Sequence, residues 1–379
     1  MALVWNQEQE MLRDSAKAFL GENAPVAHLR TLRDTRDETG FSRDLWRGFA
    51  DMGFTGVLIP EAYGGLGLGN VEAGVVAEEM GRNLTPSPFF STAVLAASAF
   101  NHAATEPQKK KYLPDMAAGK LVVALATDES SKHRPSQVGL KAVPSESGFV
   151  LNGEKILVID GHVADLLIVS ARTSGQPGDA EGITLFLVEP GTAGVHIERT
   201  AMVDAHNAAR IRFDDVRVAS DAMLGQRDQG GPVLEQILDI GRAVLAAELL
   251  GVADEVFSRT LIYLKERRQF NQLIGEFQAL QHRAAHLYSE MEITRAAVLR
   301  ALQVLDEASR ESAAMASMAK ARAGTTATLA VQEGVQMHGG MGMTDEFEIG
   351  FFMKRARVLQ ELFGDANFHA DRLARINRY

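Results

Sequence analysis

The sequence contains no cysteine, which excludes disulfide bonds, thiolate metal sites and cysteine nucleophiles in this 379-residue chain. No spacing of histidine, aspartate and glutamate residues suggests a metal site, and no serine–histidine–aspartate order stands out. Internal repeats are absent as well. A chain without thiols suits a reducing compartment, so we expect a cytoplasmic protein.

Basic clusters and long hydrophobic runs are also scarce. The chain has 39 lysines and arginines against 49 aspartates and glutamates, a formal net charge of −10, and its one cationic run, Lys109-Lys110-Lys111, is typical of a solvated helix face. Because nucleic-acid binding depends on neutralising phosphates, this charge balance argues against a nucleic-acid partner. The longest apolar stretches, such as 243–253, are broken by Glu248 and are too short to cross a membrane.

Residue periodicity divides the chain into three parts. Residues 1–119 have the spacing of helices, and Asn6 followed by Gln9 predicts a capping box at the first of them. Residues 120–230 contain short β-rich runs, and residues 231–379 return to helical spacing. We therefore predict an α+β multidomain protein with an N-terminal helical domain, a middle antiparallel β-barrel and a C-terminal four-helix bundle.

The middle part is predicted from short runs rich in β-branched and aliphatic residues, at 121–126, 149–152, 156–159, 166–170, 183–188 and 209–213. The dipeptides Asn152-Gly153 and Asp160-Gly161 separate some of these runs and are typical of tight turns. Because no helical segment lies between the runs, an antiparallel barrel or sandwich is favoured over a Rossmann fold.

Five motifs occur in a fixed order along the chain. They are Ile59-Pro60-Glu61-Ala62-Tyr63-Gly64-Gly65; Tyr112-Leu113-Pro114 with Ala126-Thr127-Asp128; Asn152-Gly153-Glu154-Lys155; Arg267-Arg268-Gln269-Phe270 with Ile274-Gly275-Glu276-Phe277-Gln278; and Gln336-Met337-His338-Gly339-Gly340-Met341-Gly342. In this order they resemble the acyl-CoA dehydrogenase family over nearly the whole chain. The resemblance implies an FAD-dependent oxidoreductase of lipid metabolism that removes two hydrogens from Cα and Cβ of an acyl-CoA thioester.

The resemblance also implies where FAD binds. Thr127 matches a threonine that hydrogen-bonds the flavin ring, and Arg267 matches an arginine that contacts FAD bound mainly to a neighbouring subunit. A guanidinium group suits this role because it offers a planar fork of donors to a pyrophosphate. The full set of expected cofactor-binding residues is Thr127, Arg267, Phe270, Gln278, Gln336, Gly339 and Gly340.

Other interpretations of these residues remain open. Taken alone, Arg267 is typical of a surface ion pair on a helix, and Gly339-Gly340 is typical of a helix C-cap. A lone histidine beside a glycine turn, such as His338, is usually a packing or hydrogen-bonding residue. Near the expected flavin ring, the tryptophan-isoleucine-threonine strand of the family reads Leu157-Val158-Ile159, and Asn271 stands where glycine is usual.

The catalytic base of the family is a carboxylate that takes the α-proton while the β-hydrogen leaves as hydride. Counting from Gly342, its usual position here is Phe363. Some branches place a glutamate before the arginine that opens the bundle, but here Gly241 precedes Arg242. Asp365 lies two residues beyond Phe363 and is typical of a turn or helix cap. We therefore assign no catalytic residue from the sequence.

Two functions are consistent with this pattern. The first is an acyl-CoA dehydrogenase with a displaced base or an unusual substrate, and the second is a companion subunit that completes the flavin site of a heteromeric dehydrogenase. We commit to the first, with FAD as cofactor and electron-transferring flavoprotein as the implied electron acceptor. We expect a homodimer or homotetramer, or a heterotetramer with a carboxylate-bearing paralogue.

Overall fold

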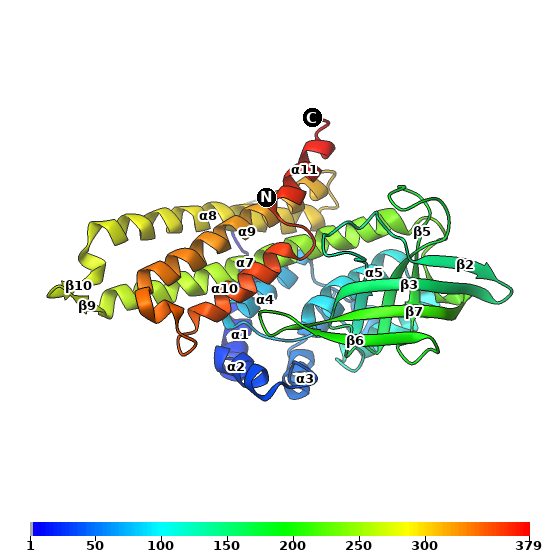
Figure 1. The fold of residues 1–379 in the computed structure, drawn as a ribbon, viewed down its shortest axis with the longest axis horizontal. Helices are drawn as coiled ribbons and strands as arrows, with labels where there is room; N and C mark the ends of the chain where they lie inside the picture. The colour runs from blue at the N-terminus through cyan, green and yellow to red at the C-terminus, as the bar shows by residue number, and fades with distance from the viewer. Residues whose placement is uncertain (1–2) are drawn as a thin grey trace. The chain divides into compact units, whose positions relative to one another are not determined.

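The computed structural model describes residues 3–379, so the first two residues of the predicted N-terminal domain lie outside the description. Helices make up both ends of the chain and a β-sheet its middle (Figure 1), which confirms the predicted fold class in this coarse form. The helices are α1 (Gln7–Asn23), α2 (Val26–Thr35), α3 (Arg43–Asp51), α4 (Asn70–Asn83), α5 (Ala97–Ala103), α6 (Glu106–Ala117), α7 (Gly230–Glu266), α8 (Gln278–Asp306), α9 (Ser312–His338), α10 (Ile349–Glu361) and α11 (Ala366–Ile376). The strands are β1 (Val123–Ala126), β2 (Lys141–Ser145), β3 (Gly148–Ile159), β4 (Leu166–Arg172), β5 (Ile183–Val188), β6 (Val195–Ala201), β7 (Asn207–Ala219), β8 (Met223–Leu224), β9 (Arg268–Gln269) and β10 (Gln272–Leu273).

Two compact units are assembled from segments that alternate along the chain. One unit contains the residues up to 31, 70–85 and 242–379, and the other contains 32–69 and 86–241. The two units are defined by contacts between residues, and each consists of segments that are not continuous in the sequence. They do not test the predicted domain boundaries at 119 and 230, which stay predictions.

The main sheet lies in the second unit. Its strand order is β6-β7-β3-β2-β4-β5-β8, with β1 beside β4. Most neighbours are antiparallel, but β1 and β2 both run parallel to β4. Strands β4 and β5 are buried along their whole length, so the core of this unit lies around them.

The predicted closed barrel is corrected to an open sheet. Within the described residues, β6 pairs only with β7 at one end of the sheet, and β8 pairs only with β5 at the other. Strand β8 is two residues long, and several side chains of β6 are exposed. The sheet therefore ends in a two-residue strand on one side and a largely exposed strand on the other.

The predicted turn at Asn152-Gly153 is also wrong. Strand β3 continues through this dipeptide, and its pairing with β7 shifts register between Leu151 and Gly153. The Asn152 side chain accepts a hydrogen bond from the Asp215 backbone N–H at 2.9 Å, and its amide nitrogen donates to Asp215 Oδ1 at 3.0 Å. Gly153 has φ +146°. An asparagine–glycine pair here forms a β-bulge rather than a hairpin turn.

The first helix of the other unit begins as predicted. The Gln9 backbone N–H donates to Asn6 Oδ1 at 2.9 Å, and the Asn6 backbone N–H donates to Gln9 Oε1 at 3.0 Å. This reciprocal pair confirms the capping box read from the sequence.

Helices α4 and α7 cross at two glycines of the same unit. A Cβ atom on Gly81 would overlap the carbonyl oxygen of Glu248, and a Cβ on Gly251 would overlap that of Glu78. The two backbones are therefore in direct contact, and any larger residue at either glycine would push the helices apart.

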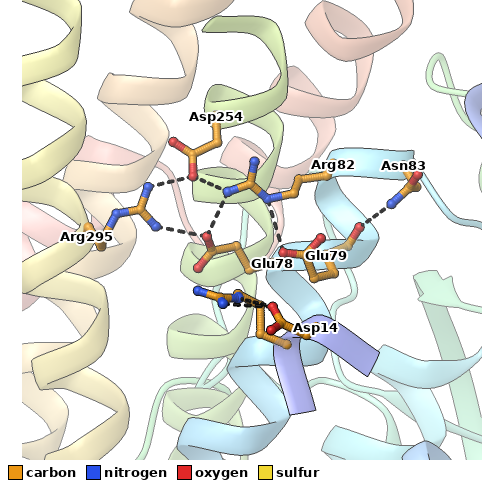
Figure 2. A network of polar contacts seen from close by, with 8 residues as sticks. Asp14, Glu78, Glu79, Arg82, Asn83, Asp254 and Arg295 are labelled. Carbon is orange, nitrogen blue, oxygen red and sulfur yellow. Dashed lines mark hydrogen bonds and ion pairs between the residues drawn. The ribbon is translucent and has the colours of Figure 1, made fainter. Parts of the chain in front are cut away.

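This crossing brings a buried charge network together (Figure 2). Arg295 of α8 donates to Glu78 Oε1 of α4 at 2.9 Å and to Asp254 Oδ2 of α7 at 2.6 Å. Arg82 of α4 also pairs with Glu78 and Asp254, and its Nε lies 3.3 Å from Glu79 Oε1. Three carboxyl groups thus face two guanidinium groups. Burial raises the pKa of Glu79 to about 7, against the attraction of Arg82, which lowers it.

We expect Glu79→Gln to remove part of the pH dependence of stability. The pKa of Glu79 is about 7 in the folded protein against an ordinary value of 4.5, so stability that is fully present below about pH 4.5 is lost as the pH rises through 7. In urea unfolding, the free energy of unfolding of the variant relative to wild type should rise between pH 5 and 8, by about 1–3 kcal/mol. Glu10→Gln, at an exposed position of α1, is the matched control. If the difference in the free energy of unfolding between Glu79→Gln and wild type stays constant with pH, the pKa of Glu79 is not raised in the folded protein.

Candidate functional site

Thr127 immediately follows β1 in the sheet-containing unit. Its side chain is buried, at 5% exposure, and its Oγ1 has no hydrogen-bond partner among residues 3–379. A buried hydroxyl without a partner costs about 1–3 kcal/mol. Such a group is suited to a ligand that supplies the missing hydrogen bond, as a flavin ring would.

Arg267 lies in the other unit, directly after α7. Its backbone N–H donates to the Tyr263 carbonyl at 2.9 Å, and its own carbonyl accepts from the Ile274 N–H at 2.9 Å. The side chain is exposed and makes no ion pair with any residue of the described chain. The alternative interpretation, a surface ion pair on a helix, is therefore not what the structure shows.

Phe270 and Asn271 form the two-residue turn of the β9–β10 hairpin. Their φ angles are +52° and +62°, so both are left-handed, as a type I′ turn requires. Asparagine tolerates this conformation, which explains why Asn271 can stand where the family has glycine. Phe270 is 88% exposed and contacts only the edge of the Phe277 ring among the described aromatic rings. The hairpin therefore presents an aromatic side chain to the surroundings.

The remaining cofactor candidates lie on neighbouring elements. Gln278 begins α8 and Gln336 lies in the last turn of α9, and both side chains are exposed. Gly339 ends α9 with φ +60°, and a Cβ added to Gly339 or Gly340 would meet no atom within 4 Å. This turn therefore has open space in which a ligand can approach the backbone.

A small hydrophobic cluster holds these elements together. Leu264, Ile274 and Met337 form its buried centre, with Phe277 and Leu280 packed against it. These residues come from the end of α7, the segment after the hairpin, the start of α8 and the end of α9. The structure thus brings all the predicted cofactor residues except Thr127 to one end of this helical unit.

His338 is a packing residue. Its ring packs against those of Tyr263 and Phe347, with centroid distances of 4.4 and 4.6 Å, and its Nδ1 is 2.7 Å from the Gly334 carbonyl oxygen. Burial lowers its pKa, so the neutral imidazole is favoured. This agrees with the interpretation preferred from the sequence.

The usual base position carries an apolar side chain. Phe363 is 6% exposed and has φ +56°, and its carbonyl accepts a hydrogen bond from Arg242 Nε at 3.3 Å. Asp365 caps α11, because its Oδ1 accepts from the Phe368 backbone N–H at 2.8 Å. The cap interpretation of Asp365 is confirmed.

Sequence reasoning missed Lys320, which is 1% exposed. Its Nζ donates to the carbonyls of Gln360 at 3.0 Å and Gly364 at 3.1 Å, on either side of Phe363. Burial, with repulsion from Arg242, lowers the pKa of Lys320 to about 7. The sequence contained one sign that Lys320 is buried. Lys320 shares a helical face with small apolar residues, namely Ala316, Ala323 and Ala327.

Comparison with known proteins identifies the chain. Models of the N-terminal, middle and C-terminal domains of acyl-CoA dehydrogenases match residues 6–120, 124–216 and 228–376. The mitochondrial long-chain specific acyl-CoA dehydrogenase of Mus musculus is 32% identical over 372 residues, which cover 96% of this chain and 85% of that protein. The chain belongs to the acyl-CoA dehydrogenase family. Its function is accordingly that of an oxidoreductase for FAD-dependent dehydrogenation of acyl-CoA thioesters.

Solved structures of acyl-CoA dehydrogenases have the same fold. Butyryl-CoA dehydrogenase from Megasphaera elsdenii is 26% identical, with a TM-score of 0.91 and 100% of both chains covered. The steroid ACAD Tcur3481-Tcur3483 is 30% identical, with a TM-score of 0.88 and 98% of both chains covered. Within residues 3–379, no group of three or more histidine, aspartate or glutamate side chains is placed to hold a metal ion. No helix of the described acyl-CoA dehydrogenase chain is both long and apolar enough to span a bilayer.

We expect Arg267→Ala to weaken FAD binding while leaving the fold intact. A charge-assisted contact with phosphate contributes about 1.5–3 kcal/mol, so the Kd for FAD should rise roughly ten- to a hundredfold. Fluorescence titration of the apoprotein with FAD measures this change. Arg268→Ala, one residue further along the hairpin, is the matched control. Equal Kd values for Arg267→Ala and wild type would remove Arg267 from the cofactor site.

Proposed function

We propose that this chain itself binds FAD and dehydrogenates an acyl-CoA thioester whose α-proton is not removed by residue 363. The observation that carries the cofactor assignment is the buried hydroxyl of Thr127, which has no protein partner. The open glycine turn at Gly339 and Gly340 and the unpaired Arg267 side chain support it further.

The chain's own residues divide into two groups in this proposal. Arg267 and Gln278 contact the phosphate and adenine end of an FAD bound mainly to a neighbouring copy, and the Gly339-Gly340 turn admits that cofactor to the backbone. Thr127 donates or accepts one hydrogen bond at the flavin ring and so fixes the orientation of the ring. FAD, when bound, supplies the acceptor for the hydrogen that leaves Cβ as hydride.

The proton step must be served by another group. A phenyl ring cannot accept a proton, and Phe363 occupies a buried turn whose carbonyls are held by Arg242 and Lys320. Asp365 lies close in sequence, but its carboxylate serves the first turn of α11. The base therefore comes from a residue elsewhere in this chain or from a neighbouring subunit.

The proposed assembly contains more than one subunit. The exposed Phe270 hairpin lies beside Arg267, in keeping with the family expectation that these residues reach FAD held mainly by a neighbouring copy. We propose a homodimer or homotetramer, with electron-transferring flavoprotein as the acceptor of electrons. The alternative is assembly with a paralogue that carries the catalytic carboxylate. It is retained because Phe363 occupies the position of that carboxylate in this chain.

We expect Phe363→Glu to increase the rate at which an acyl-CoA reduces the bound flavin. A positioned base contributes about 10²–10⁴-fold, so a gain of about a hundredfold over wild type is expected with a straight-chain ester. Because position 363 is buried, desolvation raises the pKa of a carboxyl placed there, which strengthens it as a base. Anaerobic stopped-flow absorbance of the flavin measures the rate.

Two variants sharpen this experiment. Phe363→Gln has the shape of the glutamate variant without its basicity, so it should stay as slow as wild type. Asp365→Asn keeps the helix cap, because asparagine is an equally good N-cap residue. Rapid flavin reduction by wild type that is lost in Asp365→Asn would identify Asp365 as the displaced base and would contradict its assignment as a helix cap alone.

A further inference from the structure

The segment after β1 is fixed by a buried lysine. Lys155 of β3 is fully buried, and its Nζ donates to the Thr127 carbonyl at 3.0 Å, to Glu129 Oε1 at 2.7 Å and to Ser170 Oγ at 2.9 Å. An ammonium group has three donors, and all three are satisfied here. One bond goes to the backbone of Thr127, which has the unpartnered hydroxyl.

Glu129 extends this contact to a second segment. Its Oε2 accepts from the Gly139 backbone N–H at 2.7 Å, and its Oε1 accepts from the Leu140 N–H at 3.0 Å. Glu129 therefore ties the residues after β1 to those before β2. With Lys155 bound to the same carboxylate, both segments are held against β3.

Asp128, between Thr127 and Glu129, is also held by hydrogen bonds. The carbonyl of Asp128 accepts from the Ile156 backbone N–H at 2.8 Å, and both carboxylate oxygens of Asp128 lie 3.0 Å from His133 Nδ1. Three consecutive residues, 127–129, are thus each bonded to another part of the unit. The backbone on which the Thr127 side chain stands is therefore fixed, and in this arrangement its hydroxyl meets no protein partner among residues 3–379.

Burying a lysine is costly, because its charged form loses hydration. Burial is the largest influence on the pKa of Lys155 and lowers it, while Glu129 opposes this effect. Buried ion pairs seldom add net stability over apolar residues of the same size, and their best-attested use is to specify one arrangement. The arrangement specified here is the backbone around Thr127.

We propose that Lys155 and Glu129 are positioning residues that keep the Thr127 hydroxyl free of protein partners and directed at the flavin. This inference rests on the proposed function, since it assumes that FAD binds next to Thr127. It goes beyond that function because it assigns the orientation of the hydroxyl to two residues that do not touch the cofactor.

The test is a double-variant cycle on the full chain, with the Kd for FAD and the visible absorption of bound flavin as measurements. Thr127→Val removes the hydroxyl at constant shape and should raise the Kd about three- to tenfold. Lys155→Met should raise it by a similar factor and shift the flavin absorption in the same direction. The double variant should bind no more weakly than the weaker single variant, because both remove the same contact.

A purely structural role gives a different result. In that case the two factors multiply, the flavin absorption of Lys155→Met stays that of wild type, and the inference is overturned. Lys141→Met, an exposed lysine of β2, is the control and should leave the Kd within about twofold, since surface changes have small effects. If Lys155→Met does not fold, the same cycle with Glu129→Gln decides the matter, because glutamine keeps the shape and loses the charge.

The two proposals fail in distinguishable ways. Wild-type protein that binds no FAD at all refutes the proposed function. Wild-type protein that binds FAD and is weakened by Arg267→Ala, but not by Thr127→Val, leaves the function standing and refutes the positioning role.

Discussion

Two buried basic side chains hold the turn that carries Phe363, and the backbone conformation at this position depends on them. Lys320 donates to the carbonyls of Gln360 and Gly364, and Arg242 donates to that of Phe363. Phe363 itself has φ +56°, a conformation that is unfavourable for a bulky residue and persists only where the surroundings enforce it. The turn therefore fixes the backbone of residue 363, although the phenyl side chain there has no acid–base chemistry.

The same device appears in the other unit, where Lys155 holds the carbonyl of Thr127. In both cases a buried lysine donates to at least one backbone carbonyl, and in both the fixed backbone carries a residue at a position expected in the site. The charge network of Glu78, Arg82 and Arg295 is different, because there side chains pair with side chains and the result is the packing of α4, α7 and α8. Fixed backbone at the site and paired charges in the helical packing are separate uses of buried charge.

Local signals in the sequence were sufficient for much of the fold. The capping box of Asn6 and Gln9 depends only on residues three apart, and the strand at 183–188 depends only on a short apolar run. Asn152-Gly153 misled the prediction because its meaning is set by Asp215, a residue on another strand. Sheet closure likewise depends on which strands end the sheet, which no single run of residues specifies.

In the candidate site, too, features that depend on neighbouring residues were predicted and features that depend on distant residues were not. Motif order predicted Thr127 and Arg267, whose neighbours in the chain are characteristic. Lys155 and Lys320 were not predicted as positioning groups, because the backbone carbonyls that accept from them lie 28 to 44 residues away and become neighbours only in the folded chain. The conformation of Phe363 could not be predicted either, because it depends on contacts that form only in the folded chain. That a phenylalanine occupies the base position was read directly from the sequence.

The account makes its central claim about position 363, and proton exchange tests that claim apart from the hydride step. A straight-chain acyl-CoA is incubated in D₂O with the FAD-loaded wild-type chain, and deuterium at Cα is followed by mass spectrometry. We expect wild type to incorporate deuterium about a hundredfold more slowly than Phe363→Glu, because no base faces Cα from position 363. Exchange by wild type as fast as that of Phe363→Glu would contradict the account.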